Sequence, residues 1–524
     1  MNKNQRLSEA FCRYELGKAY KRKIGLYERV RENERFFRGE QWSGGDGDLP
    51  RPVFNVVRRI VDHLVGSVAR AEFSIRYTDE SLPFFSEDKR ERLERVLSVM
   101  SRSAAARWEN SRMDRKIYRL LYDAALSGDG VIYCYWDADK ETGQPFTGDI
   151  VTEVIDSTCL FVADVNRADI QSQEYVILSG RESVEVLRRE ARAAGLSTEE
   201  VQKIRADDDK DCGAGDFARE ELGGREGEKA TYLLSFYRKN GTVFYEKSTR
   251  DVVIRRGDTG CRLYPVAYFN WEPTKNSFHG TSPVTAMIPN QRYINRAYAM
   301  IMKHLQDTAF SKVIYDKSRI PEWTNTVGEA IAAAGGGNIA DAVSVVGVGQ
   351  MQDGYMEVLA RAMSDTKELS GATDVALGEG EATNTSAILA LQESSMISLR
   401  QVRAALLQCI EDLGDIWADM MLSYYPKERM ILTLDGGGRE SIAQASLAQI
   451  RDEVLLCRVE AREISRYSAA ASQNLLDKLL EGGHITPIDY LKRLPDGAIL
   501  KRDELIELLE AKAQERRAEA CGNE

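Results

Sequence analysis

The chain has 524 residues, a formal net charge of −11 at pH 7, 43% apolar residues and 29% charged residues. This length exceeds what one hydrophobic core usually serves, so we expect roughly two to four structural regions. The negative charge argues against a protein that coats nucleic acid, because such proteins are usually basic. The negative charge does not exclude a protein whose surface DNA passes without binding to it.

The 8 cysteines are scattered along the chain and form no CxxC pair. In a chain of this length, that spacing indicates reduced, intracellular thiols. Residues 1–22 are polar and basic without an apolar core, so we do not expect a secretory signal there. No segment approaches the roughly 18 consecutive apolar residues of a membrane span, and we expect no membrane association.

The first quarter of the chain is predicted to be mostly helical. Residues 7–38 form a charged helical segment that Gly39 closes. Asn55 is a favourable N-cap for the next helix, whose apolar residues recur at helical spacing up to Val68. A longer helical stretch, 86–126, is expected to contain one or two helices.

The chain then becomes rich in β-branched and aromatic residues. Short runs of this kind predict strands at 131–136, 160–163 and 175–178. The clearest hairpin joins 232–238 to 243–246 through Asn240-Gly241, the pair that best accepts the positive φ angles of a type I′ turn. The runs at 251–255 and 265–270 are expected to extend the same sheet.

Residues 205–228 are acidic and rich in glycine, and we expect a mobile surface loop there. The run from Asp207 to Asp211 faintly resembles the start of a calcium-binding loop. Position six is Cys212 rather than glycine, and no glutamate closes the loop. We therefore reject a calcium site.

The stretch 271–371 is predicted to be a helix, a compact insert and a second helix. Pro289 suits the first turn of the first helix, because its missing N–H has no intrahelical partner there. An apolar stripe runs along this helix, formed by Ile294, Tyr298, Ile301 and Leu305. The second helix, at about 353–369, is also amphipathic. Each helix has one apolar and one charged side, so each needs neighbours from this chain or from other copies.

A loop rich in glycine and threonine follows at 374–386, and a very long helix is expected at about 387–424. Residues 430–434 are predicted to form a strand, and the remainder is predicted to be helical. One helix start is well marked there by Thr486 as N-cap and Pro487 as the first helical residue. The predicted fold class is α+β, predominantly helical.

Several short motifs occur in a particular order along residues 25–435. They are Glu34-Arg35-Phe36-Phe37-Arg38-Gly39-Glu40-Gln41-Trp42, Arg51-Pro52-Val53-Phe54-Asn55, Gly280-Thr281-Ser282-Pro283, Phe310 to Tyr315, Ser370-Gly371-Ala372-Thr373-Asp374 with Leu377-Gly378, and Asn384 to Gln392. No single motif is specific. Together their order and spacing resemble the portal proteins of tailed bacteriophages, of the podovirus type, which form the ring at the single capsid vertex through which DNA enters and leaves.

The resemblance implies a portal fold that assembles as a ring, with a part for each region. The implied parts are a wing (1–270), a first stem helix (271–309), a clip (310–350), a second stem helix (351–371), a tunnel loop (372–386), a long wing helix and strand (387–435) and a helical crown (436–524).

The resemblance also implies the function and the partners. Double-stranded DNA would be packaged and ejected through a homo-oligomeric ring, expected to be a dodecamer. The ring would dock the terminase large subunit and then the head–tail adaptor, and it would contact the major capsid and scaffolding proteins. The protein would be assembled in the host bacterial cytoplasm and would reside in the virion, at the portal vertex.

Three basic side chains of the first stem helix are the best candidates for DNA contact: Arg292, Arg296 and Lys303. They are either a solvated face, a face of the channel, or partners of the acidic row on the next subunit, which comprises Asp353, Glu357 and Asp365. Phosphate binding by many basic residues is strong at low salt, so a ring of exposed basic stripes would slow moving DNA. We therefore favour pairing between subunits, with Lys303 reaching the lumen.

The tunnel-loop candidates are Gly378, Glu379, Gly380, Glu381 and Asn384. Glycine permits large φ/ψ changes, and the two glutamates would repel phosphate, so this loop could shift with passing DNA without holding it. The alternative is an ordinary connection between helices.

The clip candidates are Lys312, Lys317, Arg319 and Trp323. The tryptophan is either a core residue or an exposed anchor for the next subunit, the motor or the adaptor.

Signals of an enzyme are weak. The chain has no GxxxxGK[ST] motif, so the phosphate cradle of a packaging ATPase is missing. The 4 histidines share no metal-ligand spacing. We expect no catalytic residues, no cofactor and no bound metal. The alternatives are a metal-dependent nuclease, which would need a cluster of carboxylates, and a head–tail adaptor ring, whose members are generally much smaller.

Overall fold

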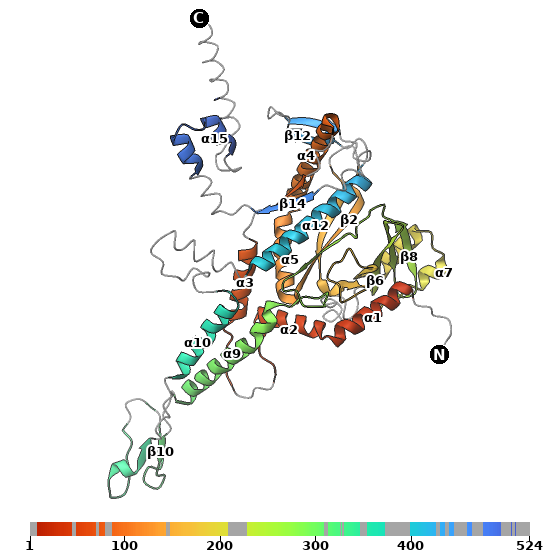
Figure 1. The fold of residues 1–524 in the computed structure, drawn as a ribbon. Helices are drawn as coiled ribbons and strands as arrows, with labels where there is room; N and C mark the ends of the chain where they lie inside the picture. Colours follow the sequence, from red (N-terminus) through yellow and green to blue (C-terminus); the bar gives the residue numbers. More distant parts are fainter. Residues whose placement is uncertain are drawn as a thin grey trace.

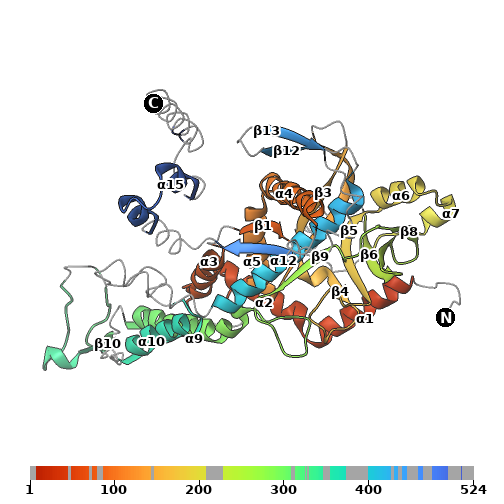
Figure 2. The ribbon, with the colours of Figure 1, turned by 45° about the horizontal axis from the view of Figure 1, so that its top comes forward.

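The computed structural model describes residues 8–44, 49–69, 73–78, 86–142, 147–207, 228–308, 313–324, 326, 330–345, 354–372, 399–425, 430–434, 440–444, 458–463, 475–493, 505 and 509. Helices and sheets form a body from which two antiparallel helices, α9 (Pro283–Thr308) and α10 (Gly354–Leu369), project side by side. A small two-stranded unit lies at the far end of this pair, and the C-terminal segments lie away from it (Figures 1 and 2).

The N-terminal part is helical, as predicted. Its helices are α1 (Glu9–Lys23), α2 (Leu26–Arg38), α3 (Val56–Val68), α4 (Glu87–Asn110) and α5 (Met113–Ser127). Gly39 ends α2 with a φ of 91°, and the Asn55 side chain accepts a hydrogen bond of 3.0 Å from the Arg58 N–H at the start of α3. Both predicted helix boundaries are therefore confirmed.

Three carboxylates from separate elements gather beside α5: Glu34 of α2, Asp123 of α5 and Asp156 before the 3₁₀ turn η2 (Ser157–Cys159). The pKa of Asp123 is raised to about 6, chiefly by burial; Arg119 opposes this rise, and the charges of Asp156 and Glu34 add to it. The folded protein therefore holds a proton on Asp123 more tightly than the unfolded chain does. This contribution to stability is complete below the unfolded pKa of about 3.9 and is lost as the pH rises through about 6.

The Asp123→Asn variant is expected to be more stable than the wild type at pH 8, by about 1 kcal/mol after allowance for solvent screening. The difference should shrink towards zero below about pH 3, where the carboxyl is protonated in both states. Urea titrations at several pH values measure it. If Asp123→Asn raises the free energy of unfolding by the same amount at every pH, burial of the ionised carboxylate is not the cause of the gain.

Two antiparallel sheets form the rest of the body. One has the strand order β3-β2-β9 and the other the order β4-β5-β6-β7-β8. The strands are β2 (Asp129–Glu141), β3 (Thr147–Ile155), β4 (Leu160–Val162), β5 (Tyr175–Ser183), β6 (Lys229–Lys239), β7 (Thr242–Ser248), β8 (Val253–Asp258) and β9 (Val266–Asn270). Helices α6 (Val184–Ala193) and α7 (Thr198–Gln202) follow β5.

The hairpin between β6 and β7 is confirmed, with φ angles of 53° at Asn240 and 84° at Gly241. The prediction that 265–270 extends this sheet is wrong. Strand β9 instead pairs with β2, where Phe269 lies opposite Gly130. A run of apolar residues predicts that a strand exists but does not identify the strand beside it. Here the burial of both faces of β9 decides that neighbour.

The main core lies between the sheet β3-β2-β9 and the helices α3, α4, α5 and α12 (Arg400–Tyr424). Side chains of β2 alternate: Ile132 and Cys134 face this core, whereas Val131 faces a second core between the two sheets. Helix α12 continues through Gly414, whose carbonyl accepts a hydrogen bond of 2.8 Å from the Tyr77 hydroxyl. The part of the long predicted helix before residue 399 lies outside the described residues.

The prediction that everything after residue 436 is helical is wrong. Strand β12 (Met430–Leu434), which was predicted, pairs with β13 (Glu440–Gln444). Strand β14 (Arg458–Glu463) pairs over its six residues with β1 (Phe73–Thr78), a strand that sequence patterning did not indicate. The β14 sequence has good helix formers, so tertiary pairing overrides local propensity there. Helix α15 (Pro487–Arg493) begins as predicted, with the Asp489 N–H donating to the Thr486 hydroxyl at 3.1 Å.

Candidate functional site: the projecting helix pair

Helix α9 begins at Pro283, not near Pro289 as predicted, and residues 271–282 precede it. Pro289 therefore lies inside the helix, where its missing N–H removes one i→i−4 hydrogen bond. The earlier start is possible because the Ser282 hydroxyl accepts a hydrogen bond of 3.1 Å from the Val284 N–H and donates one of 2.5 Å to the Ala125 carbonyl. Ser282 thus caps the helix and joins it to α5.

A buried carboxylate fixes the segment that leads into α9. Asp129 accepts hydrogen bonds from the Gly280 N–H at 2.7 Å and the Asn270 amide at 2.9 Å, and it lies 2.7 Å from Nδ1 of His279. Asp129 is 1% exposed and His279 is 5% exposed. Three partners therefore satisfy one buried carboxylate, and they tie the beginning of β2 to the root of the projecting helix. We call Asp129 with these three partners the root clamp.

The Gly-Thr-Ser-Pro motif has a steric reason in this arrangement. A Cβ at Gly280 would lie 2.8 Å from the carbonyl oxygens of both Glu272 and Gly128. Gly128 has a φ of +96°, and a Cβ there would lie 2.6 Å from the Gly280 carbonyl oxygen. Two backbones cross at van der Waals distance, and only glycine fits at either position.

A second polar network holds the next two turns of α9. Gln291 is fully buried, and its side chain donates to the Phe54 carbonyl at 2.8 Å and to Oδ1 of Asn295 at 2.9 Å. Its oxygen accepts from the Val56 N–H at 3.0 Å. Asn295, 2% exposed, donates to Oε1 of Gln41 at 2.7 Å. These amides join α9 to the segment between α2 and α3, so the first half of α9 is fixed to the body.

Side chains on the outer half of the helix pair are less buried than those on the first half of α9. Of the predicted apolar stripe, Ile294 is buried and Tyr298 and Ile301 are half-buried, but Leu305 is 57% exposed. The two helices contact each other through Tyr298, whose hydroxyl lies 3.8 Å from Sδ of Met363, and Leu359 is buried at 2% exposure. Other apolar side chains of the pair are exposed, namely Tyr293, Met300, Met302, Tyr355, Met356, Val358 and Leu369. Exposed apolar surface of this extent indicates a protein–protein contact.

Comparison with protein-family models now identifies the chain. The model described as phage P22-like portal protein matches residues 198–454, a range that includes both projecting helices and the small sheet at their tip. This match supports a phage portal protein of the podovirus type. A search among curated proteins finds no match. Phage portal proteins are structural components of the capsid vertex, and they form oligomeric rings that act with the capsid, the terminase and DNA.

The predicted DNA-contact residues of this portal protein have different surroundings. Arg292 forms an ion pair with Glu32 of α2, and its guanidinium lies 5.3 Å from the centre of the Phe36 ring. Arg296 is exposed, and Lys303 lies 3.4 Å from Asp307 on its own helix. Arg292 is therefore held by its own body, whereas Arg296 and Lys303 remain on the outer surface of the pair. The structure does not bring the three together.

The acidic row on α10 is partly engaged within that helix, because Asp365 lies 3.7 Å from Arg361. Glu357 is exposed, and Asp353 lies outside the described residues. The tunnel-loop candidates Gly378, Glu379, Gly380, Glu381 and Asn384 also lie outside the described residues.

The unit at the tip of the pair is a two-stranded sheet of β10 (Val313–Tyr315) and β11 (Val343–Val345). Trp323 is half-buried and stacks on Tyr315 with ring centres 5.4 Å apart. Arg319 donates to the Asn338 carbonyl at 3.3 Å, Lys317 is exposed, and Lys312 lies outside the described residues. Trp323 therefore packs within its own unit and keeps part of its ring accessible.

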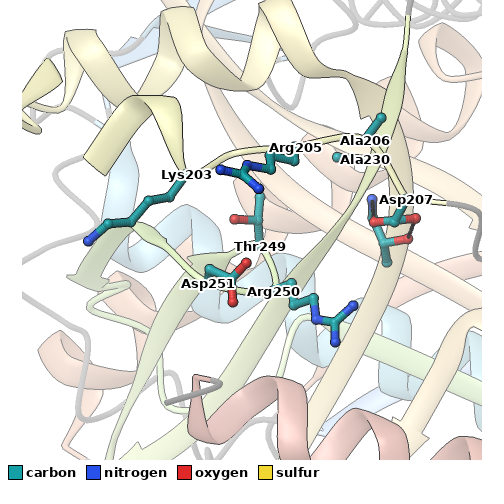
Figure 3. Close-up of a pocket in the computed structure, with 9 residues that line it drawn as sticks. Lys203, Arg205, Ala206, Asp207, Ala230, Thr249, Arg250 and Asp251 are labelled. Carbon is teal, nitrogen blue, oxygen red and sulfur yellow. Dashed lines mark hydrogen bonds between the residues drawn. The ribbon is translucent and has the colours of Figure 1, made fainter. Parts of the chain in front are cut away.

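Within the described ranges, no group of three or more His, Cys, Asp or Glu side chains is arranged to hold a metal ion. Asp207, the first residue of the rejected calcium motif, is engaged instead by the Thr231 N–H at 2.7 Å, the Thr231 hydroxyl at 2.8 Å and Arg181 at 3.1 Å. It lines a cavity of about 230 Å³ at the end of the sheet (Figure 3). None of the described helices combines the length and apolar composition needed to cross a bilayer.

Sequence reasoning missed the root clamp and the amide network. Their residues are polar and widely separated in the chain, and His279 alone gave no metal-ligand spacing. The one available signal was the pair Gln291 and Asn295, which flank the apolar stripe at i, i+4 spacing and so were candidates for a buried polar pair.

Proposed function

We propose that twelve copies of this chain form a portal ring in which α9 and α10 are the stem helices around the channel. One observation carries the proposal: the outer half of this helix pair projects from the body with apolar side chains exposed on both helices. A single chain leaves this surface in water, and neighbouring copies around a ring would bury it.

In this proposal the body up to about residue 270, with α12, is the wing, and the β10–β11 unit at the tip is the clip. The clip would meet the terminase large subunit during packaging and a head–tail adaptor afterwards, with Lys317, Arg319 and Trp323 as contact candidates. The wing would meet the major capsid and scaffolding proteins, and assembly would occur in the host cytoplasm. Residues 372–386 would form the tunnel loop, and residues 436–524 the crown.

The mechanism in this proposal is steric and electrostatic rather than catalytic. The root clamp and the amide network give each stem a fixed angle, so identical copies present identical faces to one another. A ring of acidic chains repels duplex DNA and lets it move, and a few basic side chains such as Lys303 would touch the phosphates without gripping them.

Light scattering and negative-stain imaging of the purified full chain test the proposal. We expect a ring of uniform mass with a central hole wide enough for duplex DNA. A stable monomer or dimer, together with DNA cleavage that a chelator abolishes, would instead favour the metal-dependent nuclease.

The Lys303→Glu variant is expected to form rings and to reduce DNA packaging or retention about tenfold, because a repelling carboxylate replaces a phosphate partner in the lumen. Arg90→Glu is the matched control. Arg90 lies on α4, outside the helix pair, and like Lys303 it lies close to an acidic residue one turn away, 3.7 Å from Glu94. Counting DNA-filled particles by nuclease protection measures the effect. If Lys303→Glu abolishes ring formation, the residue belongs to the subunit interface and not to the lumen.

A further inference from the structure

Helix α9 carries one positive charge within an exposed apolar surface. Tyr293 and Met300 are 51% and 52% exposed, and Arg296, which lies between them along the helix, is exposed as well. With 3.6 residues per turn, the three side chains lie within an arc of about 60° around the helix. We call these three residues the α9 arc. In the described part of the chain, Arg296 forms no hydrogen bond or ion pair.

Helix α10 carries the complementary arrangement, a carboxylate within an exposed apolar surface. Val358 and Leu369 are 53% and 83% exposed, and the Asp365 side chain is 54% exposed. These three residues, which we call the α10 arc, lie within about 40° of one another around the helix. Nε of Arg361 lies 3.7 Å from Oδ2 of Asp365, and no donor among the described residues reaches Oδ1. Asp365 can therefore accept from a second cation.

The composition of the α9 arc indicates what kind of surface covers it. Exposed apolar side chains of this size are typical of a contact with protein, so a partner that buries Tyr293 and Met300 also buries Arg296. A buried guanidinium is costly unless a carboxylate meets it. The covering surface is therefore expected to be apolar around one carboxylate, which is the composition of the α10 arc.

The two arcs point away from the contact between α9 and α10 of one chain. That contact joins Tyr298 to Met363, whose hydroxyl and Sδ atoms lie 3.8 Å apart. Tyr298 lies about 140° around α9 from Tyr293, and Met363 lies about 160° around α10 from Asp365. The α10 arc that meets an α9 arc must therefore belong to a second copy.

The arcs also lie at matching levels along the helix pair. The two helices are antiparallel and lie side by side (Figure 1), so a step towards the body on α9 corresponds to a step forward in sequence on α10. Arg296 precedes Tyr298 by two residues, and Asp365 follows Met363 by two residues, so Arg296 and Asp365 share one level. Rotation about a ring axis leaves each level unchanged. For helix pairs that run along that axis, the same levels meet between neighbouring copies.

We propose that the α9 arc of one copy packs against the α10 arc of the next copy, with Arg296 donating to Asp365 across the interface. This inference rests on the proposed function, because a ring of copies supplies the partner. The same register brings Tyr293 within one residue of the level of Leu369, so these two exposed apolar side chains bury each other beside the ion pair. Arginine suits this position because its planar fork binds a carboxylate through two hydrogen bonds.

A charge-swap series on the full chain tests the pairing, and light scattering against protein concentration is the measurement. Arg296→Glu places two carboxylates together and should raise the concentration at which half of the protein is in rings at least about tenfold. Asp365→Arg should act in the same direction. The double variant Arg296→Glu with Asp365→Arg restores an opposite-charge pair and should return this concentration to within about threefold of the wild type.

Arg296→Glu combined with Glu357→Arg is the matched control. Glu357 is also exposed on α10, but it lies about 12 Å from Asp365 along the helix, so it should not restore assembly. Equal restoration by both double variants, or by neither, would overturn the pairing. Equal ring formation in every variant would refute the pairing and leave the ring, whereas a wild type that forms no rings would refute the ring and the pairing together.

A disulfide test measures the register without altering either charge. Tyr293→Cys with Leu369→Cys, oxidised with copper phenanthroline, should give a ladder of linked multimers in a denaturing gel, because cysteines with Cα atoms about 4.4–6.8 Å apart can bond. Tyr293→Cys with Val358→Cys is the matched control, since Val358 lies in the same arc but about 16 Å from Leu369 along α10. The wild type gives the background from Cys12, which is exposed. Equal ladders from both pairs, or none from either pair in samples that form rings, would overturn the register.

Discussion

Replacing Asp129 with alanine is expected to lower the free energy of unfolding by about 3–5 kcal/mol, because buried polar groups lose their shared acceptor. The carboxylate accepts from the Gly280 N–H and the Asn270 amide and contacts His279, and all of these bonds are lost together. The Gly280 N–H and the His279 ring stay buried without this acceptor, and that desolvation cost dominates, whereas the Asn270 amide keeps its hydrogen bonds to Tyr268 and Phe278. Urea titration followed by tryptophan fluorescence measures the loss, because Trp271 lies next to the root clamp.

The Asp139→Ala variant is the matched control. Asp139 lies on the same strand, β2, but is exposed, so its loss should stay within about 0.5 kcal/mol. A loss below about 1 kcal/mol in Asp129→Ala would show that the clamp does not fix the stem. Because the clamp sets the angle of α9, we also expect Asp129→Ala to form irregular rings even under conditions in which it remains folded.

Local features of the fold could be predicted from the sequence. Caps at Asn55 and Thr486, the stop at Gly39 and the turn at Asn240-Gly241 each depend on a few neighbouring residues, and each lies where it was predicted. Strand partners could not be predicted. Strand β9 pairs with β2 across more than a hundred residues, and β14 pairs with β1 across almost four hundred, so no local pattern reports either contact.

The candidate site shows the same limit. Helical periodicity correctly predicted two amphipathic helices, and it placed Arg292, Arg296 and Lys303 on one stripe. It could not show that Glu32, 260 residues earlier in the chain, reaches Arg292 and removes it from the stripe. Pro289 misled for a related reason, since proline favours a first turn but is tolerated inside a helix when neighbouring contacts hold the helix in place. Here those contacts come from Ser282, Gln291 and Asn295.

The Met300→Glu variant is expected to lower the fraction of protein in rings at least about tenfold. Met300 lies on the outer half of α9 and is 52% exposed in the single chain, and Tyr293, two turns earlier on the same face, is 51% exposed. In a ring this face would be buried against the next copy, and an unpaired carboxylate there costs several kcal/mol at every interface. Light scattering against protein concentration measures the shift from rings to monomers.

The fold of the single chain should not change, because Met300 makes little contact with its own body. Circular dichroism and the urea midpoint of Met300→Glu should therefore equal those of the wild type. Gln306→Glu adds the same charge to an exposed position on a different face of α9 and should leave ring formation intact. If Met300→Glu assembles as well as Gln306→Glu, the exposed apolar face is not a subunit interface. The ring would then have to be held by the wing, and the stem helices would line the channel without packing against one another.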